Sequence, residues 1–273
     1  MCITITPLGT VSTYCYENKN CPGFLVEYNK HKILLDCGNG ISKNLNLPND
    51  FKNLTIIISH LHPDHYGELL SLAQTSLVFS RLGYIDKKIK VYIPQGDKIK
   101  VKEDGYDPDG WSTSKTVEKN IIDFDYLLSL EKDSFLEFIP YQEDDELHFD
   151  DLEVCFARNP HPLITYSTKL ETDRLKLVYS SDTGYKGNIL EEFAKDANLL
   201  ICESTFIKGQ IRNNDNHLFA HEAAMIAKNA NVEKLLLTHF WPTIDKQKYV
   251  DEAKEIFEST EAAEENKKLI LRR

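Results

Sequence analysis

The amino-acid sequence predicts an α/β protein in which two β-sheets pack face to face with helices on their outer sides. Two groups of strand-like segments lie within residues 3–58 and 135–180. Between residues 187 and 259, helix-like and strand-like segments alternate, as they do where parallel strands are covered by helices. Strand groups that are each flanked by helices fit a sandwich of two sheets with the helices outside.

The first group opens as a meander and ends in a cluster of histidines. Its strand-like segments lie near residues 3–9, 23–28, 32–36 and 54–58. The third segment runs into Asp36-Cys37-Gly38-Asn39-Gly40, whose glycines indicate a tight turn. The fourth is a short apolar run typical of a buried strand, and it leads directly into Ser59-His60-Leu61-His62-Pro63-Asp64-His65. A helix over residues 66–78 and a strand over residues 88–94 are expected to follow.

Residues 96–134 look like an insertion. They mix turn signals such as Asp107-Pro108-Asp109-Gly110 with a helix expected around residues 117–130. The lysines of this stretch are interleaved with acids, which favours a solvated surface over an RNA-binding clamp. These lysines are Lys98, Lys100, Lys102, Lys115 and Lys119.

The remaining residues predict the second sheet and its helices. Strands are expected near residues 135–140, 145–149, 152–157, 164–170 and 174–180. Further along, three helices alternate with two strands, the helices over 187–196, 218–229 and 246–259 and the strands over 198–202 and 233–238. The acidic, lysine-rich tail over residues 261–268 is expected to be a solvated end. We find no low-complexity linker and no composition change that marks a domain boundary.

Composition and charge indicate an ordinary globular protein. The 273 residues are 41% hydrophobic, which is ample for a core, and no apolar run approaches the roughly 20 residues that span a bilayer. There are 32 basic and 43 acidic residues, and the resulting net charge of −11 disfavours a long nucleic acid as a partner.

The N-terminus and the cysteines predict a cytoplasmic protein. The first residues show no positively charged segment followed by a long apolar stretch, so no signal peptide is expected. The cysteines form no Cys-x-x-Cys pair, and reduced thiols fit best. They are Cys2, Cys15, Cys21, Cys37, Cys155 and Cys202. A disulfide between Cys15 and Cys21 is the alternative, which would need an oxidising compartment.

The segment from Ser59 to His65 concentrates residues that bind metals. In an extended or looped segment, residues two apart point the same way, so His60 and His62 can converge on one metal while Asp64 and His65 are left for a second. Imidazole nitrogens and carboxylate oxygens are ligands that zinc and its neighbours prefer, and a catalytic site keeps one position open for water. A histidine-rich surface loop is the alternative, which the buried strand before the cluster disfavours.

The pattern His-x-His-x-Asp-His resembles the signature of the metallo-β-lactamase superfamily, whose hydrolases form a four-layered αββα sandwich. Three segments resemble the rest of that pattern, namely Asn159-Pro160-His161-Pro162, Ser180-Ser181-Asp182-Thr183-Gly184 and Leu237-Thr238-His239-Phe240. The resemblance begins at Leu8-Gly9-Thr10 and implies a single domain over residues 1–273. It also implies two divalent metal ions, Zn²⁺ before Mn²⁺ or iron, with His60, His62 and His161 on one, Asp64, His65 and His239 on the other, and Asp182 between both.

Within the superfamily, the resemblance is to the ribonuclease Z-like branch. The segments His217-Leu218-Phe219-Ala220-His221-Glu222-Ala223-Ala224 and Cys202-Glu203-Ser204-Thr205-Phe206 are similar to that branch's histidine motif and acidic strand end. This resemblance implies phosphodiester cleavage by a metal-bridged hydroxide, with His217 as general acid or as a stabiliser of the transition state. The alternative for His217 is a plain neighbour of a helix cap. We expect Asp64 to be both a ligand and an acceptor that orients the attacking water.

Two departures from the branch bear on the substrate. Ribonuclease Z carries a flexible basic arm between the third-ligand histidine and the bridging aspartate, whereas here little more than one hairpin separates His161 from Asp182. The usual glycine before the aspartate is replaced by Ser181. An additional histidine, His221, lies one helical turn beyond His217 and is expected to be exposed, although such a pair can bind metal. We therefore expect a small or short phosphodiester as substrate, and a transfer-RNA 3′-processing role is disfavoured.

Several alternatives stay open. The same site could hydrolyse carboxylic esters, lactones, thioesters or sulfate esters, or the fold could be a non-catalytic binding module. An iron-dependent oxidoreductase would need a flavin domain that the sequence does not show. Asp36 and Glu203 could orient metal-bound imidazoles or cap turns, and Tyr166 and Trp241 could line the substrate site or belong to the core. A homodimer is left open because dimers are common in the resembling group.

Overall fold

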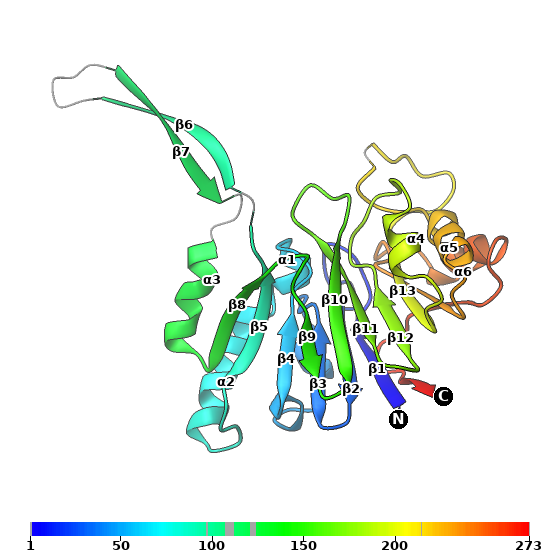
Figure 1. Cartoon of the computed structure of the whole chain (residues 1–273), viewed down its shortest axis with the longest axis horizontal. Helices are drawn as coiled ribbons and strands as arrows, with labels where there is room; N and C mark the ends of the chain where they lie inside the picture. Colours follow the sequence, from blue (N-terminus) through cyan, green and yellow to red (C-terminus); the bar gives the residue numbers. More distant parts are fainter. Residues whose placement is uncertain (1, 97, 107–111, 121–123, 214, 273) are drawn as a thin grey trace.

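Two seven-stranded sheets face one another, and helices cover their outer sides (Figure 1). The computed structural model describes residues 2–96, 98–106, 112–120, 124–213 and 215–272. A two-stranded hairpin extends away from both sheets (Figure 1).

The first sheet has the order β16-β1-β2-β3-β4-β5-β8. Its strands are β1 (Cys2–Gly9), β2 (Gly23–Tyr28), β3 (His31–Leu35), β4 (Leu54–Ile57), β5 (Ile89–Pro94), β8 (Leu136–Tyr141) and β16 (Leu269–Arg272). The pairs on one side, from β16 to β3, are antiparallel, whereas β3, β4, β5 and β8 run parallel. All residues of β4 are buried, as expected for an apolar strand in the middle of a parallel sheet.

The second sheet has the order β15-β14-β13-β12-β11-β10-β9. Its strands are β9 (Leu147–Phe149), β10 (Leu152–Arg158), β11 (Tyr166–Glu171), β12 (Lys176–Tyr179), β13 (Leu199–Glu203), β14 (Leu235–Thr238) and β15 (Thr260–Ala262). The pairs from β9 to β12 are antiparallel and those from β12 to β15 are parallel. Because β10 and β12 are both antiparallel to β11, they run in the same direction as β13 and β14. The carboxyl ends of these four strands therefore lie at the same end of the sheet.

Helices bury one face each against the outer sides of the sheets. The described helices are α1 (Pro63–Tyr66), α2 (Leu69–Arg81), α3 (Phe124–Leu130), α4 (Ile189–Phe193), α5 (Ala220–Asn229) and α6 (Lys246–Lys254), with 3₁₀ turns η1 (Ile41–Asn44), η2 (Asn49–Phe51) and η3 (Glu131–Asp133). Leu72 of α2 joins an apolar cluster on the first sheet, and Ala223 of α5 joins one on the second. A third cluster, which includes Phe24 and Leu177, fills the space between the sheets. The predicted αββα sandwich is confirmed, and no described helix is long and apolar enough to cross a membrane.

The predicted insertion forms a hairpin, and the helix expected over residues 117–130 is partly wrong. β6 (Lys98–Tyr106) and β7 (Ser112–Asn120) pair antiparallel, so the described residues up to Asn120 form a strand, and those of α3 (Phe124–Leu130) form a helix. The β-branched residues Thr113, Thr116 and Val117 of β7 favour a strand over a helix there. The turn predicted at residues 107–110 and the side chains of the five insertion lysines lie outside the described residues.

The prediction that residues 261–268 form a solvated end is only partly right, because most of these residues are exposed but the stretch begins in a strand and connects the two sheets. Thr260–Ala262 adds strand β15 to the second sheet, and the following chain returns to the first sheet, where β16 pairs with β1. Between these strands, the Glu265 carboxylate accepts hydrogen bonds from the backbone N–H of Asn20 at 2.7 Å and its side chain at 2.8 Å. The charged residues of this stretch hide the two strands beside it, because short edge strands are only half buried and need few apolar residues.

Gly184 lets three loops meet at the edge where the carboxyl ends of the second sheet lie. Its N–H donates to the Pro160 carbonyl at 3.0 Å, and a Cβ at this position would lie 1.7 Å from the Asp215 carbonyl oxygen. Pro160 and Asp215 belong to the segments that carry His161 and His217. The backbone of these loops therefore packs so closely that only glycine fits.

We predict that Gly184→Ala lowers the free energy of unfolding by about 1–3 kcal/mol, because the added methyl group must displace backbone atoms. Urea unfolding at fixed metal concentration measures this change. Gly96→Ala is the matched control, because a Cβ there meets no described atom within 4 Å, and its effect should stay under about 1 kcal/mol. Equal effects of the two substitutions would contradict the close packing at Gly184.

Candidate metal centre

The seven residues expected to bind metals all lie at the same edge of the sandwich, five of them in loops and two in a short helix. His60 and His62 follow β4, and Asp64 and His65 lie in α1. The others follow three strands of the second sheet, with His161 after β10, Asp182 after β12 and His239 directly after β14. Both sheets thus contribute ligand-type side chains, and residues more than 170 positions apart in the sequence become neighbours, as His65 and His239 show.

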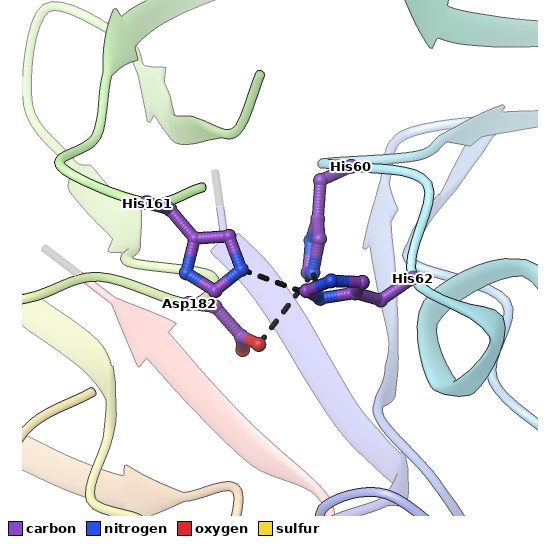
Figure 2. A group of neighbouring side chains, drawn as sticks. All are labelled: His60, His62, His161 and Asp182. Atoms are coloured by element: carbon purple, nitrogen blue, oxygen red, sulfur yellow. Dashed lines mark hydrogen bonds and ion pairs between the residues drawn. The ribbon is translucent and has the colours of Figure 1, made fainter. Parts of the chain in front are cut away.

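The first group consists of His60, His62, His161 and Asp182, whose side chains point toward a common point in Figure 2. His62 Nδ1 lies 3.0 Å from His60 Nε2 and 3.3 Å from His161 Nε2. Asp182 Oδ2 lies 3.5 Å from His60 Nε2. Ligand atoms at about 2.0–2.1 Å from a tetrahedral metal ion are about 3.3–3.4 Å from one another, so this group has the size of a zinc-type site.

The second group contains Asp64, His65 and His239 and shares Asp182 with the first. Asp182 Oδ1 lies 3.3 Å from His65 Nε2 and 3.2 Å from His239 Nε2. The two imidazole nitrogens are 3.4 Å apart, and Asp64 Oδ2 lies 3.6 Å from His239 Nε2. One oxygen of Asp182 therefore faces each group.

The chemistry of the site fits divalent cations. His60 and His65 are fully buried, and Asp182 Oδ1 is buried without a hydrogen bond to any described group. Buried lone pairs that face one another are costly unless a cation lies between them. Nitrogen and carboxylate donors in this combination are those of zinc and its first-row neighbours.

At His60, His161 and Asp182 the site's electrostatics favour the protonation states that bind metal, whereas at His65 the carboxylates of Asp182 and Asp36 outweigh burial and raise the pKa. Burial lowers the pKa of His161 to about 4 and that of His60 well below its ordinary value, so both imidazoles are neutral. Burial alone would raise the pKa of the Asp182 carboxyl, but His239 and His65 beside it hold that pKa well below its usual range. Neutral imidazoles and an ionised carboxylate are the forms that coordinate a metal ion.

His217 lies next to both groups without belonging to the seven. Its Nδ1 is 2.9 Å from Glu203 Oε1 and 3.9 Å from Asp182 Oδ2, and its ring stacks on His239 at 5.4 Å. Burial opposes protonation, but the Glu203 carboxylate raises the pKa of His217 to about 9. His217 lies two residues before Phe219, the N-cap of α5, and its ring also contacts His239 and Glu203 of the candidate centre.

His221 lies apart from this centre. Its Nδ1 contacts Glu252 Oε1 at 2.6 Å, its ring stacks on Phe219, and it belongs to none of the metal-type groups among the described residues. The side chain is 27% exposed and is held by the buried Glu252, so the expectation of an exposed, unengaged histidine is only partly right.

The two carboxylates with open roles both contact histidines of the site. Asp36 Oδ2 lies 2.8 Å from His65 Nδ1, and Glu203 holds His217 as described. The two aromatic residues with open roles lie in different surroundings. Tyr166 packs in the core against Tyr141, whereas Trp241 is 39% exposed.

Sequence reasoning missed contacts made by backbone groups and hydroxyls. The backbone N–H of Thr13 donates to Asp64 Oδ2 at 2.8 Å, and the hydroxyls of Ser59 and Thr205 lie against metal-type histidines. No sequence signal marks such contacts, since any residue has a backbone N–H and threonine is common in loops. In the Thr13 loop, the Sγ atoms of Cys15 and Cys21 are 4.0 Å apart, and all six cysteines are free thiols.

Comparison with known proteins places the chain in a family. A family model described as Anti-Pycsar protein Apyc1 matches residues 3–262. The chain is 27% identical to the probable metallo-hydrolase YhfI of Bacillus subtilis, over 86% of each protein, and 28% identical to ribonuclease Z of Archaeoglobus fulgidus, over 97% of this chain and 96% of that protein. The crystal structure of the metallo-β-lactamase fold protein YhfI from Bacillus subtilis superposes with a TM-score of 0.82 at 24% identity, covering 99% of this chain and all of that one. The chain therefore belongs to the Anti-Pycsar protein Apyc1 family, and it is a metal-dependent hydrolase of the metallo-β-lactamase superfamily close to the ribonuclease Z-like branch.

Proposed function

We propose that this protein is a dinuclear metal-dependent phosphodiesterase that acts on small or short phosphodiesters. The observation that carries the proposal is the position of Asp182, whose two oxygens face two separate groups of ligand atoms. A carboxylate placed in this way can bridge two cations. Two divalent ions bound there, which we propose to be zinc, supply charge to the phosphoryl oxygens and an activated water.

Asp64 and His217 have different tasks in this proposal. Asp64 is partly exposed, and the N–H of Thr13 fixes its Oδ2, so the carboxylate can accept a proton from water while it holds the second metal. His217, held by Glu203, can donate a proton to the leaving oxygen or stabilise charge on the phosphoryl group.

A small substrate agrees with the charge and the loops around the site. The segment between His161 and Asp182 contains β11 and β12 as a short hairpin and no additional described element. With a net charge of −11, the protein lacks the excess of cations through which long polyanions gain affinity. Two metals and one or two side chains are enough to hold a single phosphodiester.

Hydrolysis of carboxylic esters, lactones, thioesters or sulfate esters is the second candidate, because the same activated water attacks a carbonyl carbon as well. The protonated His217, which Glu203 holds in place, favours phosphodiester hydrolysis over this second candidate. A cationic proton donor in addition to the metal ions is more useful at a phosphoryl group than in lactone opening. Similarity to proteins named ribonuclease Z also supports phosphodiester chemistry. The free thiols support our proposal of a cytoplasmic location.

The first prediction from this proposal concerns metal content. Purified protein with excess zinc should hold about two equivalents by elemental analysis. Asp182→Ala should lower occupancy of both sites because its oxygens face both, whereas His239→Ala should empty mainly the second. Asp64→Asn keeps the shape of the side chain but loses its charge, and it should lose more activity than metal.

His148→Ala is the matched control for metal content, because this histidine is 61% exposed and lies in none of the metal-type groups among the described residues. It should bind as much zinc as the wild type. A folded wild-type protein that never holds more than one equivalent would reject the dinuclear proposal.

The second prediction concerns the substrate. A chromogenic or cyclic phosphodiester should be hydrolysed with weak dependence on salt, because few cationic side chains contribute to binding. His217→Ala should lower the turnover of this ester by about 10²–10⁴-fold, the usual range for loss of an acid catalyst. Steady-state kinetics over a series of ionic strengths measures both effects.

His221→Ala serves as the control, because it removes a histidine from the same segment that faces Glu252 instead of the metal centre. Its activity should stay close to that of the wild type. Efficient, salt-sensitive trimming of a precursor transfer RNA, with negligible turnover of the small ester, would overturn the proposed substrate. Unchanged turnover in His217→Ala would remove the role given to His217.

A further inference from the structure

Two buried carboxylates lie behind the metal centre, one in each sheet. Asp36 follows β3 of the first sheet and is fully buried, and Glu203 ends β13 of the second sheet and is 1% exposed. Each directly holds one imidazole, since Asp36 contacts His65 Nδ1 and Glu203 contacts His217 Nδ1. Each also accepts a hydrogen bond from a hydroxyl that itself touches a second imidazole, and Asp36 accepts one more from the Tyr179 hydroxyl at 2.6 Å.

In the second sheet, the hydroxyl belongs to Thr205. Its Oγ1 donates to Glu203 Oε2 at 2.8 Å and lies 2.8 Å from His239 Nδ1. A hydroxyl has one proton, and an ionised carboxylate can only accept, so the proton of Thr205 points to Glu203. The oxygen of Thr205 must then accept from His239 Nδ1–H, which leaves the lone pair of His239 Nε2 free to face Asp182 and His65.

In the first sheet, Ser59 makes the equivalent contacts. Its Oγ donates to Asp36 Oδ2 at 2.9 Å and lies 3.1 Å from His60 Nδ1. The hydroxyl of Ser181 donates to Ser59 Oγ at 2.6 Å. The one proton and both lone pairs of Ser59 are therefore used, and His60 is held with its Nε2 toward the metal position.

We propose that Thr205 and Ser59 are positioning residues that connect His239 and His60 to the two buried carboxylates, so that each carboxylate orients two imidazoles. Asp36 thereby acts on a ligand of each metal, and Glu203 acts on both a ligand of the second metal and the proposed proton donor His217. The inference rests on the proposed dinuclear function. Beyond that function, the inference states that the metal affinity of each site depends on one hydroxyl that does not touch the metal.

The alternative is that these hydroxyls only satisfy buried polar groups. The carboxylates do not depend on them, since Glu203 also accepts from the backbone N–H of Thr183 at 2.8 Å and of Leu218 at 3.2 Å, and Asp36 from that of Ser59 at 2.7 Å. Loss of either hydroxyl should therefore leave the fold intact. What is lost is the acceptor that fixes the tautomer and the orientation of one imidazole.

The experiment is a competition titration of metal-free protein with Zn²⁺ against a chromophoric chelator, which reports a dissociation constant for each site. Thr205→Val should weaken one of the two sites by about 10–100-fold, the usual cost of losing a group that orients a ligand, and leave the other unchanged. Thr205→Ser keeps the hydroxyl and should restore affinity. In a His239→Ala background, Thr205→Val should have no further effect on the remaining site.

Thr238→Val is the matched control, because Thr238 is a buried threonine beside His239 whose Oγ1 has no hydrogen-bond partner among the described residues. It should bind both metal ions as the wild type does. Ser59→Ala tests the same principle at the other site, and it keeps the inference testable if Thr205→Val does not fold.

The outcomes separate this inference from the proposed function. A wild type that binds only one Zn²⁺ would reject the dinuclear proposal and this inference with it. A wild type that binds two, with dissociation constants unchanged in both Thr205→Val and Ser59→Ala, would overturn the inference alone. Equal weakening by Thr205→Val and Thr205→Ser would also overturn it, because the hydroxyl would then not be the cause.

Discussion

The carboxylate of Asp182 is the group on which the site depends. It is buried, its Oδ1 has no hydrogen bond among the described residues, and imidazole nitrogens surround both of its oxygens. An uncompensated charge in such a place would cost several kcal/mol. The arrangement is stable when positive charge is supplied between these groups, so the position of Asp182 links the fold of the protein to the binding of cations.

The fold holds this arrangement through strained turns at the ends of strands. Asp36, Ser181 and His239 follow β3, β12 and β14, and their φ values are 61°, 52° and 60°. This left-handed conformation is uncommon for residues other than glycine and is typical of sites where the chain must turn sharply to aim a side chain. At Ser181 a glycine would turn more easily, but the serine hydroxyl contacts Ser59 and thereby the network behind His60.

The sequence could predict the centre because its ligands are concentrated in short patterns, and the four ligand-type residues His60, His62, Asp64 and His65 alone indicate two metals. The αββα sandwich followed from strand periodicity and from the resemblance. The sequence could not predict β15 and β16, which have three and four residues and are separated by a charged, mostly exposed stretch, or the hairpin partner of β7. Nor could it predict the roles of Ser59 and Thr205, which arise only where distant strands bring a hydroxyl, a carboxylate and an imidazole together.

The most direct test is a crystal structure of the zinc-loaded protein with anomalous diffraction measured above and below the zinc edge. We predict two anomalous peaks about 3.5–4 Å apart, with Asp182 between them, one peak beside His60, His62 and His161 and the other beside Asp64, His65 and His239. A single peak, or peaks away from Asp182 in a fully loaded crystal, would contradict the account.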